Sequence, residues 1–308
     1  MGADPTRAGV TVAVDPADAG RTAAFYRARP AGRGPADLPE LRAARAAMPP
    51  PVPASPPAVP VVAEADGHAV PVRVTEPAGP PRGVLLEIHG GGFYLGSAAA
   101  GDLRNRALAD ALGVAVVAVD YRLAPERPWP AAPDDCATAA LWLLDRAPGL
   151  FGTDRVAFTG ASAGATLVAT TLLRLRDRGL VGRVAGAELR FGTYDLSATT
   201  PAGRRIADEY FLRAYAGHVA DRTDPDLSPV FADLTGLPPV LLTVGTDDVL
   251  LDDDLAMADR LVAAGVDVDL RLYPGVPHGF TGHDTPVAEL ARRHAQEWLS
   301  GRLAAPPR

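Results

Sequence analysis

Short apolar runs that alternate with amphipathic stretches constrain the fold of this chain most strongly. Near-continuous apolar runs of this kind are typical of strands buried on both faces of a parallel sheet. They occur at Val84–Ile88, Val114–Val119, Val156–Thr159 and Val240–Val244. The stretches with helical periodicity are Leu103–Leu112, Ala132–Arg146, Ala163–Arg178, Asp253–Ala264 and Pro286–Leu303. The alternation predicts a doubly wound α/β fold with a mostly parallel sheet.

One further run, Val266–Tyr273, has a different pattern. Its sequence VDVDLRLY alternates apolar and charged residues with period two, so one face of the strand should contact water. We therefore expect this strand near an edge of the sheet.

Two segments depart from the alternation of strands and helices. The first has helical stretches at Pro16–Arg29 and Ala36–Met48 and then the extended, proline-rich Pro49–Pro60. The second, Tyr194–Leu234, is longer than an ordinary connection and has its own helical stretch at Arg204–Val219. We expect the insertion and residues 1–48 to lie together over the carboxyl edge of the sheet. The predicted parts are residues 1–60 (N-terminal cap helices and strap), 61–193 (first part of the core), 194–234 (cap insertion) and 235–308 (second part of the core).

The absence of lysine excludes several enzyme classes. All 30 basic residues are arginines, whereas P-loop nucleotide binding, pyridoxal phosphate chemistry and Schiff-base catalysis each need a lysine amine. The net charge of −7 does not suit a nucleic-acid-binding protein. The single cysteine, Cys136, can form neither an internal disulfide nor a multi-cysteine zinc site, and it fits a reducing compartment. We expect no cofactor and no metal.

Hydropathy predicts a cytoplasmic protein without a membrane span. The first ten residues lack the apolar segment of a secretory signal. The longest apolar stretch, Ala111–Val119, is far shorter than the roughly 18 residues that a spanning helix needs. The acidic cluster Asp252–Asp254 lacks the spaced ligands of a calcium loop, so we interpret it as a solvated helix start.

The pentapeptide Gly160–Gly164, GASAG, is the first candidate for chemistry. It follows the predicted strand Val156–Thr159 and opens an apolar helix. A serine on such a sharp strand-to-helix turn presents its hydroxyl to solvent, and small neighbours are needed because the backbone doubles back. The pattern favours Ser162 as a nucleophile; the alternative is a glycine- and alanine-rich turn.

The loop His89–Phe93, HGGGF, is the second candidate. Three successive glycines cost backbone entropy, but they allow the main chain to present free N–H groups close to a ligand. In an acyl-transfer enzyme such a loop stabilises an oxyanion together with the N–H that follows the nucleophile, here that of Ala163. A flexible turn and a phosphate cradle are the alternatives, and the missing lysine weakens the second.

An acid and a base complete the pattern. Of the six histidines, His278 lies in a loop directly after Val266–Tyr273, and His283 is its nearest competitor. His68, His218 and His294 are interpreted as solvated. Asp247 and Asp248 follow the strand Val240–Val244, at the same expected edge of the sheet. The order serine, aspartate, histidine along the chain is that of α/β-hydrolases.

Together these motifs resemble those of the hormone-sensitive-lipase family of α/β-hydrolases, bacterial esterases with an HGGG motif and an N-terminal cap. The resemblance covers about residues 60–300. The matching segments are His89–Phe93, Tyr121–Glu126 (YRLAPE), Gly160–Gly164, Gly236–Pro239, Val244–Thr246 with the aspartates after it, and Pro277–Phe280.

The resemblance implies an α/β-hydrolase fold with a helical cap and assigns roles to individual residues. It implies Ser162 as nucleophile, His278 as general base and Asp248 as the acid, with Asp247 as the alternative. It implies oxyanion donors at Gly91, Gly92 and Ala163. Phe93 and Tyr94 are candidates for substrate contact, and Arg122 and Glu126 are expected to pair and brace the sheet.

Ala161 and Ala165 depart from the family pattern, which commonly has an acidic residue before the serine and a glycine after the motif. Neither position supplies a triad side chain or an oxyanion donor, so the departures bear on substrate class more than on mechanism. We expect a serine esterase acting on small-molecule esters with short-to-medium acyl groups, with no nucleic-acid partner and a homodimer as a candidate assembly. The alternatives are an amide or lactone hydrolase, an acyltransferase, and a non-catalytic ligand-binding protein.

Overall fold

The computed structural model describes residues 9–29 and 32–304 and has one mixed sheet at its centre. Its strands are β1 (Gly9–Thr11), β2 (Val59–Ala65), β3 (His68–Thr75), β4 (Val84–Ile88), β5 (Ala115–Val119), β6 (Val156–Ala161), β7 (Val184–Arg190), β8 (Val240–Gly245) and β9 (Val268–Tyr273). The spatial order is β1-β9-β8-β7-β6-β4-β5-β3-β2. The pairs β2–β3 and β3–β5 are antiparallel and the other neighbouring pairs are parallel, so the prediction of a mostly parallel sheet is confirmed.

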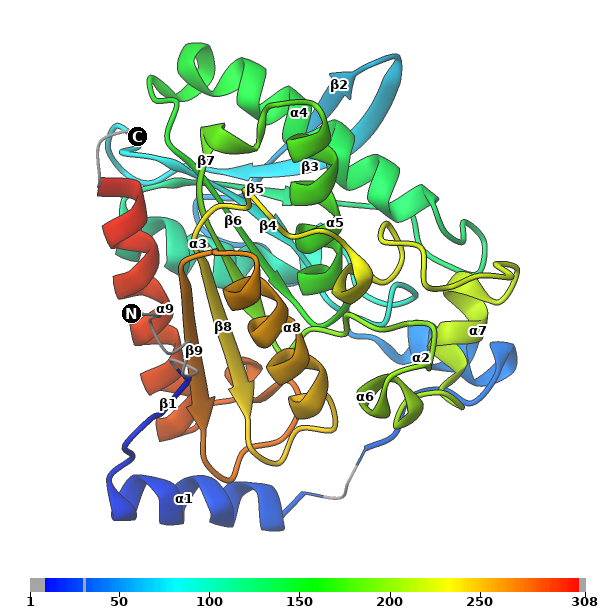
Figure 1. The fold of residues 1–308 in the computed structure, drawn as a ribbon. Helices are drawn as coiled ribbons and strands as arrows, with labels where there is room; N and C mark the ends of the chain where they lie inside the picture. The colour runs from blue at the N-terminus through cyan, green and yellow to red at the C-terminus, as the bar shows by residue number, and fades with distance from the viewer. Residues whose placement is uncertain (1–8, 30–31, 305–308) are drawn as a thin grey trace, which may run out of the picture.

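The helices form a layer on each face of the sheet, with α4, α5 and α8 on one side and α3 and α9 on the other (Figure 1). Their bounds are α1 (Pro16–Arg27), α2 (Leu38–Ala47), α3 (Asp102–Leu112), α4 (Ala131–Phe151), α5 (Ala163–Asp177), α6 (Pro201–Arg204), α7 (Tyr210–Ala216), α8 (Leu251–Ala263) and α9 (Pro286–Ala304). Short 3₁₀ turns lie at η1 (Ala98–Gly101), η2 (Val181–Arg183), η3 (Pro229–Phe231) and η4 (Phe280–Gly282). The apolar strands β4, β5 and β8 are buried along their whole length, as predicted for a sheet covered on both faces.

Three features of the sheet were not predicted. Strand β7 contains the charged residues Glu188 and Arg190, so its sequence is not an apolar run. Strand β1 is three residues long, pairs with β9 and forms the edge of the sheet. Strand β9, which was expected near an edge, is therefore the second strand of the sheet. Strands β2 and β3 form a hairpin that begins inside the proline-rich segment.

The N-terminal helices lie in different places. Arg45 of α2 donates to the carbonyl oxygens of Tyr94 (3.0 Å) and Ala124 (2.6 Å). Arg213 of α7 reaches the carbonyl of Ala36 (3.2 Å), so α2 lies beside the insertion as expected (Figure 1). Helix α1 packs against α9 instead. Helix α1 lies at the end of the sheet toward which the arrows of β8 and β9 point, but not beside the insertion (Figure 1). The expectation that the insertion and residues 1–48 lie together over the carboxyl edge is therefore wrong for α1 only in its closeness to the insertion.

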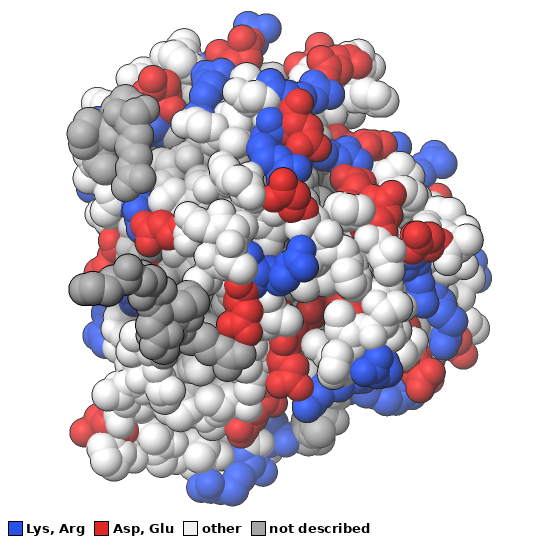
Figure 2. All heavy atoms as spheres, viewed as in Figure 1, with Lys and Arg blue, Asp and Glu red and all other residues white. Residues whose placement is uncertain are grey.

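Charged side chains of both signs are interspersed over the face in Figure 2. Ion pairs link many charged side chains of the protein; Arg174, for example, contacts Asp134 (2.8 Å) and Asp226 (2.5 Å). Among the described residues, no helix combines the length and the apolar character that crossing a bilayer requires.

Candidate active site

Ser162 occupies a sharp turn between β6 and α5. Its backbone has φ 54° and ψ −126°, a conformation that is strained for any residue with a side chain. A Cβ atom on Gly160 would lie 2.3 Å from the carbonyl oxygen of Gly164, and one on Gly164 would lie 2.1 Å from that of Ile88. Both glycines are thus required by the close approach of backbone segments, and the turn holds the serine at the N-terminus of α5.

Ser162, His278 and Asp248 form a continuous hydrogen-bonded chain. The Ser162 Oγ lies 3.0 Å from His278 Nε2, and His278 Nδ1 lies 3.0 and 3.1 Å from the two carboxylate oxygens of Asp248. Asp248 is buried, and its Oδ1 also accepts the Leu250 N–H (2.9 Å). Asp247 is exposed, and its Oδ1 contacts the neighbouring Thr246 hydroxyl (3.3 Å). Of the two candidate acids, the one within reach of the imidazole is Asp248.

The glycine loop lies beside the serine because of the register of the sheet. Ile88, the last residue of β4, pairs with Gly160 of β6, so both loops leave the sheet side by side. Gly91 and Gly92 have φ angles of 120° and 58°. The N–H groups of Gly91, Gly92 and Ala163 donate to no described residue. They are therefore free to bind a developing oxyanion.

Contacts from outside the loop keep it in place. The buried His89 ring stacks on Tyr121, with ring centroids 4.2 Å apart, and the Tyr121 hydroxyl donates to the His89 carbonyl (2.9 Å). His89 Nδ1 donates to the Gly90 carbonyl (2.8 Å), and burial lowers the pKa of this imidazole. The neutral ring and the tyrosine of the YRLAPE segment thus stabilise one loop conformation.

The comparisons with known proteins agree with this geometry. Residues 85–282 match a family model described as alpha/beta hydrolase fold. The chain is an α/β-hydrolase. It is 36% identical over 236 residues to an ethyl acetate hydrolase of Pseudomonas putida, covering 70% of this chain and 72% of that protein. It is 38% identical over 219 residues to an acetyl-hydrolase of Streptomyces hygroscopicus, covering 68% and 71%.

A solved structure places the hydrolase more finely. A hormone-sensitive lipase from a metagenome library superposes with a TM-score of 0.71 at 32% identity, covering 85% of this chain and 90% of that one. The resemblance to the hormone-sensitive-lipase family is thus confirmed, together with the fold that it implied.

The side chains expected to contact substrate lie in different surroundings. Phe93 of the hydrolase is fully buried and stacks on Tyr215 with ring centroids 3.9 Å apart, so its ring has no free face. Tyr94 is 5% exposed, and burial together with the nearby Glu209 raises its pKa to about 12. Phe211 of α7, which the sequence did not single out, lies over the glycine loop. A Cβ on Gly92 would be 3.2 Å from the Cβ of Phe211.

The interpretation of Asp252–Asp254 as a solvated helix start is wrong for two of the three residues. Asp253 and Asp254 are buried, whereas Asp252 is partly exposed and pairs with Arg205 (2.7 Å). Asp253 Oδ2 accepts the N–H of Tyr194 (2.7 Å), so α8 anchors the start of the insertion. Burial raises the pKa of Asp253 to about 6. Burial and the nearby Asp248 and Asp253 raise that of Asp254 well above its ordinary value.

The expected Arg122–Glu126 pair is also absent. Arg122 instead pairs with the buried Asp135 of α4 (2.8 Å), and Glu126 pairs with Arg45 of α2 (2.8 Å). Both ion pairs join the YRLAPE segment to a helix, so the segment is braced by partners that are distant in sequence.

Among the described residues, the histidine hydrogen-bonded to Ser162 is His278, and the other candidates have different partners. His283 accepts or donates a hydrogen bond with the Tyr26 hydroxyl (3.0 Å), and His68 and His218 are exposed as expected. His294 was expected to be solvated, but it is partly buried and bonded to the Tyr273 hydroxyl (2.9 Å). Within residues 9–29 and 32–304, no group of three or more histidine, cysteine, aspartate or glutamate side chains could hold a metal ion.

Proposed function

We propose that this hydrolase is a serine carboxylic-ester hydrolase that acts on short-to-medium acyl esters through an acyl-enzyme. The observation that carries the proposal is the distance of 3.0 Å between Ser162 Oγ and His278 Nε2, with Asp248 on the other side of the same imidazole. A serine hydroxyl is a weak nucleophile until a neighbouring base accepts its proton. The chain of contacts provides that base and holds its tautomer.

In the first half of the reaction, Ser162 Oγ attacks the ester carbonyl while His278 Nε2 takes the hydroxyl proton. Asp248 stabilises the imidazolium that forms. The negative charge on the carbonyl oxygen is stabilised by the N–H groups of Gly91, Gly92 and Ala163. His278 then gives its proton to the leaving alcohol, and the acyl group remains on Ser162.

In the second half, water replaces the alcohol. His278 takes a proton from the water as it attacks the acyl carbonyl, and the same three N–H groups stabilise the second oxyanion. Collapse of the intermediate releases the carboxylic acid and returns the proton to Ser162. No step needs a metal or a cofactor.

Two observations favour a short acyl group. Aromatic side chains flank the reacting atoms: Phe191 contacts His278 edge-on, with ring centroids 5.1 Å apart, and Phe211 lies against the glycine loop. Two of the relatives have names that specify an acetyl group, an ethyl acetate hydrolase and an acetyl-hydrolase, whereas others are named as a carboxylesterase and an arylesterase. We propose a small-molecule ester as substrate, and we retain the cytoplasmic location and the homodimer as predictions.

A panel of p-nitrophenyl esters of increasing acyl length tests the proposal, with Ser162→Ala as the matched variant. We expect kcat/KM to be highest for short acyl chains and to fall to background in Ser162→Ala. Matched p-nitroanilides and a lactone separate the alternative hydrolases, and added alcohol separates an acyltransferase by its ester product. Ester hydrolysis that persists in Ser162→Ala would contradict the proposal, as would the absence of turnover with every ester.

A further inference from the structure

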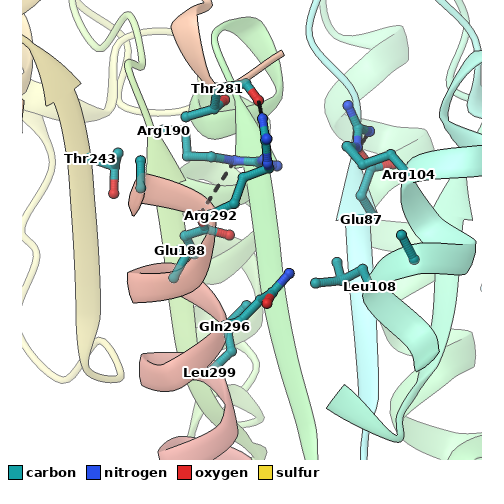
Figure 3. Close-up of a pocket in the computed structure, with 13 residues that line it drawn as sticks. Glu87, Arg104, Leu108, Glu188, Arg190, Thr243, Thr281, Arg292, Gln296 and Leu299 are labelled. Carbon is teal, nitrogen blue, oxygen red and sulfur yellow. Dashed lines mark hydrogen bonds and ion pairs between the residues drawn. The ribbon is translucent and has the colours of Figure 1, made fainter. Parts of the chain in front are cut away.

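A cavity of about 150 Å³ lies on the face of the sheet that α3 and α9 cover (Figure 3). Glu87 of β4 and Arg104 of α3 line one side of it, and Glu188 and Arg190 of β7 with Arg292 of α9 line the other. A water needs roughly 10–15 Å³ by the same measure, so the cavity has room for a molecule of about ten heavy atoms. It is separate from the glycine loop and from Ser162.

The charges that line this cavity do not balance. Three guanidinium groups and two carboxylates leave one positive charge in excess. Arg292 Nη1 donates to the carbonyl oxygens of Thr281 (2.8 Å) and His283 (3.1 Å). Among the described residues, the Arg292 guanidinium makes no other hydrogen bond and no carboxylate neutralises it. Arg190 Nε lies 3.5 Å from Glu188 Oε1 and makes no hydrogen bond with a described residue.

A single negative charge would complete this side of the cavity. The Arg190 and Arg292 side chains extend toward each other from β7 and α9 (Figure 3). Guanidinium groups bind carboxylates through parallel N–H donors, and the partly buried Arg292 has no carboxylate partner among the described residues. The excess of one charge matches a monocarboxylate.

The opposite side needs a hydrogen-bond donor. Glu87 is 1% exposed, and its Oε1 pairs with Arg104. Its Oε2 is buried and has no partner among the described residues. An uncharged donor such as a hydroxyl would bond to this oxygen without changing the net charge of the cavity. An ammonium group would bring back the one excess positive charge that the carboxylate balances.

Apolar side chains complete the lining, from Ala107 and Leu108 of α3 to Ala291, Ala295 and Leu299 of α9. We propose that this cavity binds a small hydroxycarboxylate, with its carboxylate on Arg190 and Arg292, its hydroxyl on Glu87 Oε2 and its carbon chain between α3 and α9. Because Arg292 also holds the carbonyl groups of η4 and His283, the bound acid tightens the segment that follows His278.

Isothermal titration calorimetry of the intact protein with lactate, 3-hydroxybutyrate and 4-hydroxybutyrate tests the proposal. These acids place the hydroxyl at different distances from the carboxylate. We expect at least one to bind with a Kd of about 1 mM or tighter and to raise the melting temperature. Butyrate, which lacks the hydroxyl, and 1,4-butanediol, which lacks the carboxylate, should each bind about tenfold more weakly or worse.

A pair of variants on α3 separates this cavity from other binding places. Ala107 lines the cavity and is exposed, so Ala107→Trp should obstruct it with little effect on the core. Ala111, one turn further and also exposed, does not line it, and Ala111→Trp is the control. We expect Ala107→Trp alone to weaken binding at least tenfold. Absence of binding of all three acids to the unaltered protein would overturn the proposal, and so would equal binding by both variants.

Discussion

The buried carboxyl of Asp253 should make the free energy of unfolding of this protein fall as the pH rises from about 4 to about 6. Burial raises the pKa of Asp253 to about 6, from an ordinary value near 3.8. Its Oδ2 accepts the N–H groups of Tyr194 and Asp195 (2.7 and 3.3 Å). Asp253→Asn keeps the shape of the side chain and a carbonyl acceptor but removes the ionisation.

The size of the effect follows from the pKa shift. In the unfolded chain the carboxyl loses its proton near pH 4, whereas in the folded chain it keeps the proton until about pH 6. The folded state binds more protons in this window, so its free energy of unfolding falls as pH rises. A difference of about two pKa units corresponds to about 3 kcal/mol. The contribution is complete below pH 4 and lost above pH 6.

Urea unfolding at a series of pH values measures this effect as a difference between variants. We expect Asp253→Asn to gain about 3 kcal/mol relative to the unaltered protein between pH 4 and pH 7. Asp252→Asn is the matched control, because Asp252 is the neighbouring residue and is partly exposed. It should show no such gain. A difference between Asp253→Asn and the unaltered protein that is constant across this range would refute the reasoning.

Further predictions concern the acid and the turn at the serine. Asp248→Asn should lower kcat about ten-thousandfold, because an amide cannot hold the His278 tautomer or stabilise its charge. Asp247→Asn, at the exposed neighbour, should keep activity close to that of the unaltered enzyme in the same ester assay. Gly164→Ala should destabilise the fold by about 3 kcal/mol in urea, because its Cβ would meet the Ile88 carbonyl oxygen at 2.1 Å. Gly149→Ala, in α4 with nothing within 4 Å, should instead stabilise it by about 0.5–1 kcal/mol.

The backbone conformation of Gly92 makes Gly92→Pro unsuitable as a test of the oxyanion donors. Proline at position 92 would remove one oxyanion donor, and the sequence alone offers no objection to it. Gly92, however, has φ 58°, whereas proline requires a φ of about −65°. The substitution would rearrange the loop, so a loss of activity there could not be assigned to the missing N–H.

The elements that the sequence predicted well are those whose signal is local. The buried strands β4, β5, β6 and β8 have near-continuous apolar runs, and the loops that follow them carry the glycines, the serine and the aspartates. Parallel strands bring such loops to one edge, so the convergence of Ser162, Asp248 and His278 could be expected from their positions in the chain. Strand β7 was not predicted because it contains two charged residues, the buried Glu188 and the partly buried Arg190, which line the cavity beneath α3 and α9.

The errors concern side chains whose partners are distant in sequence. Arg122 and Glu126 lie close together in the chain, but α4 and α2 supply their partners. For Asp253 and Asp254 a local signal did exist. Four residues after each of them, α8 buries Met257 and Ala258, so helical periodicity puts both aspartates on the buried face. Phe211 carries no such signal, because its place over the glycine loop depends on how the insertion folds back.

Labelling with a fluorophosphonate tests the central claim most directly. The reagent reacts with a serine that a neighbouring base activates, and mass spectrometry of the digested protein locates the adduct. We expect one adduct per chain, on the peptide that contains Ser162, and almost none in His278→Ala. An adduct on another residue, or equal labelling of Ser162 after removal of the imidazole, would show that the 3.0 Å contact between Ser162 Oγ and His278 Nε2 does not activate the serine.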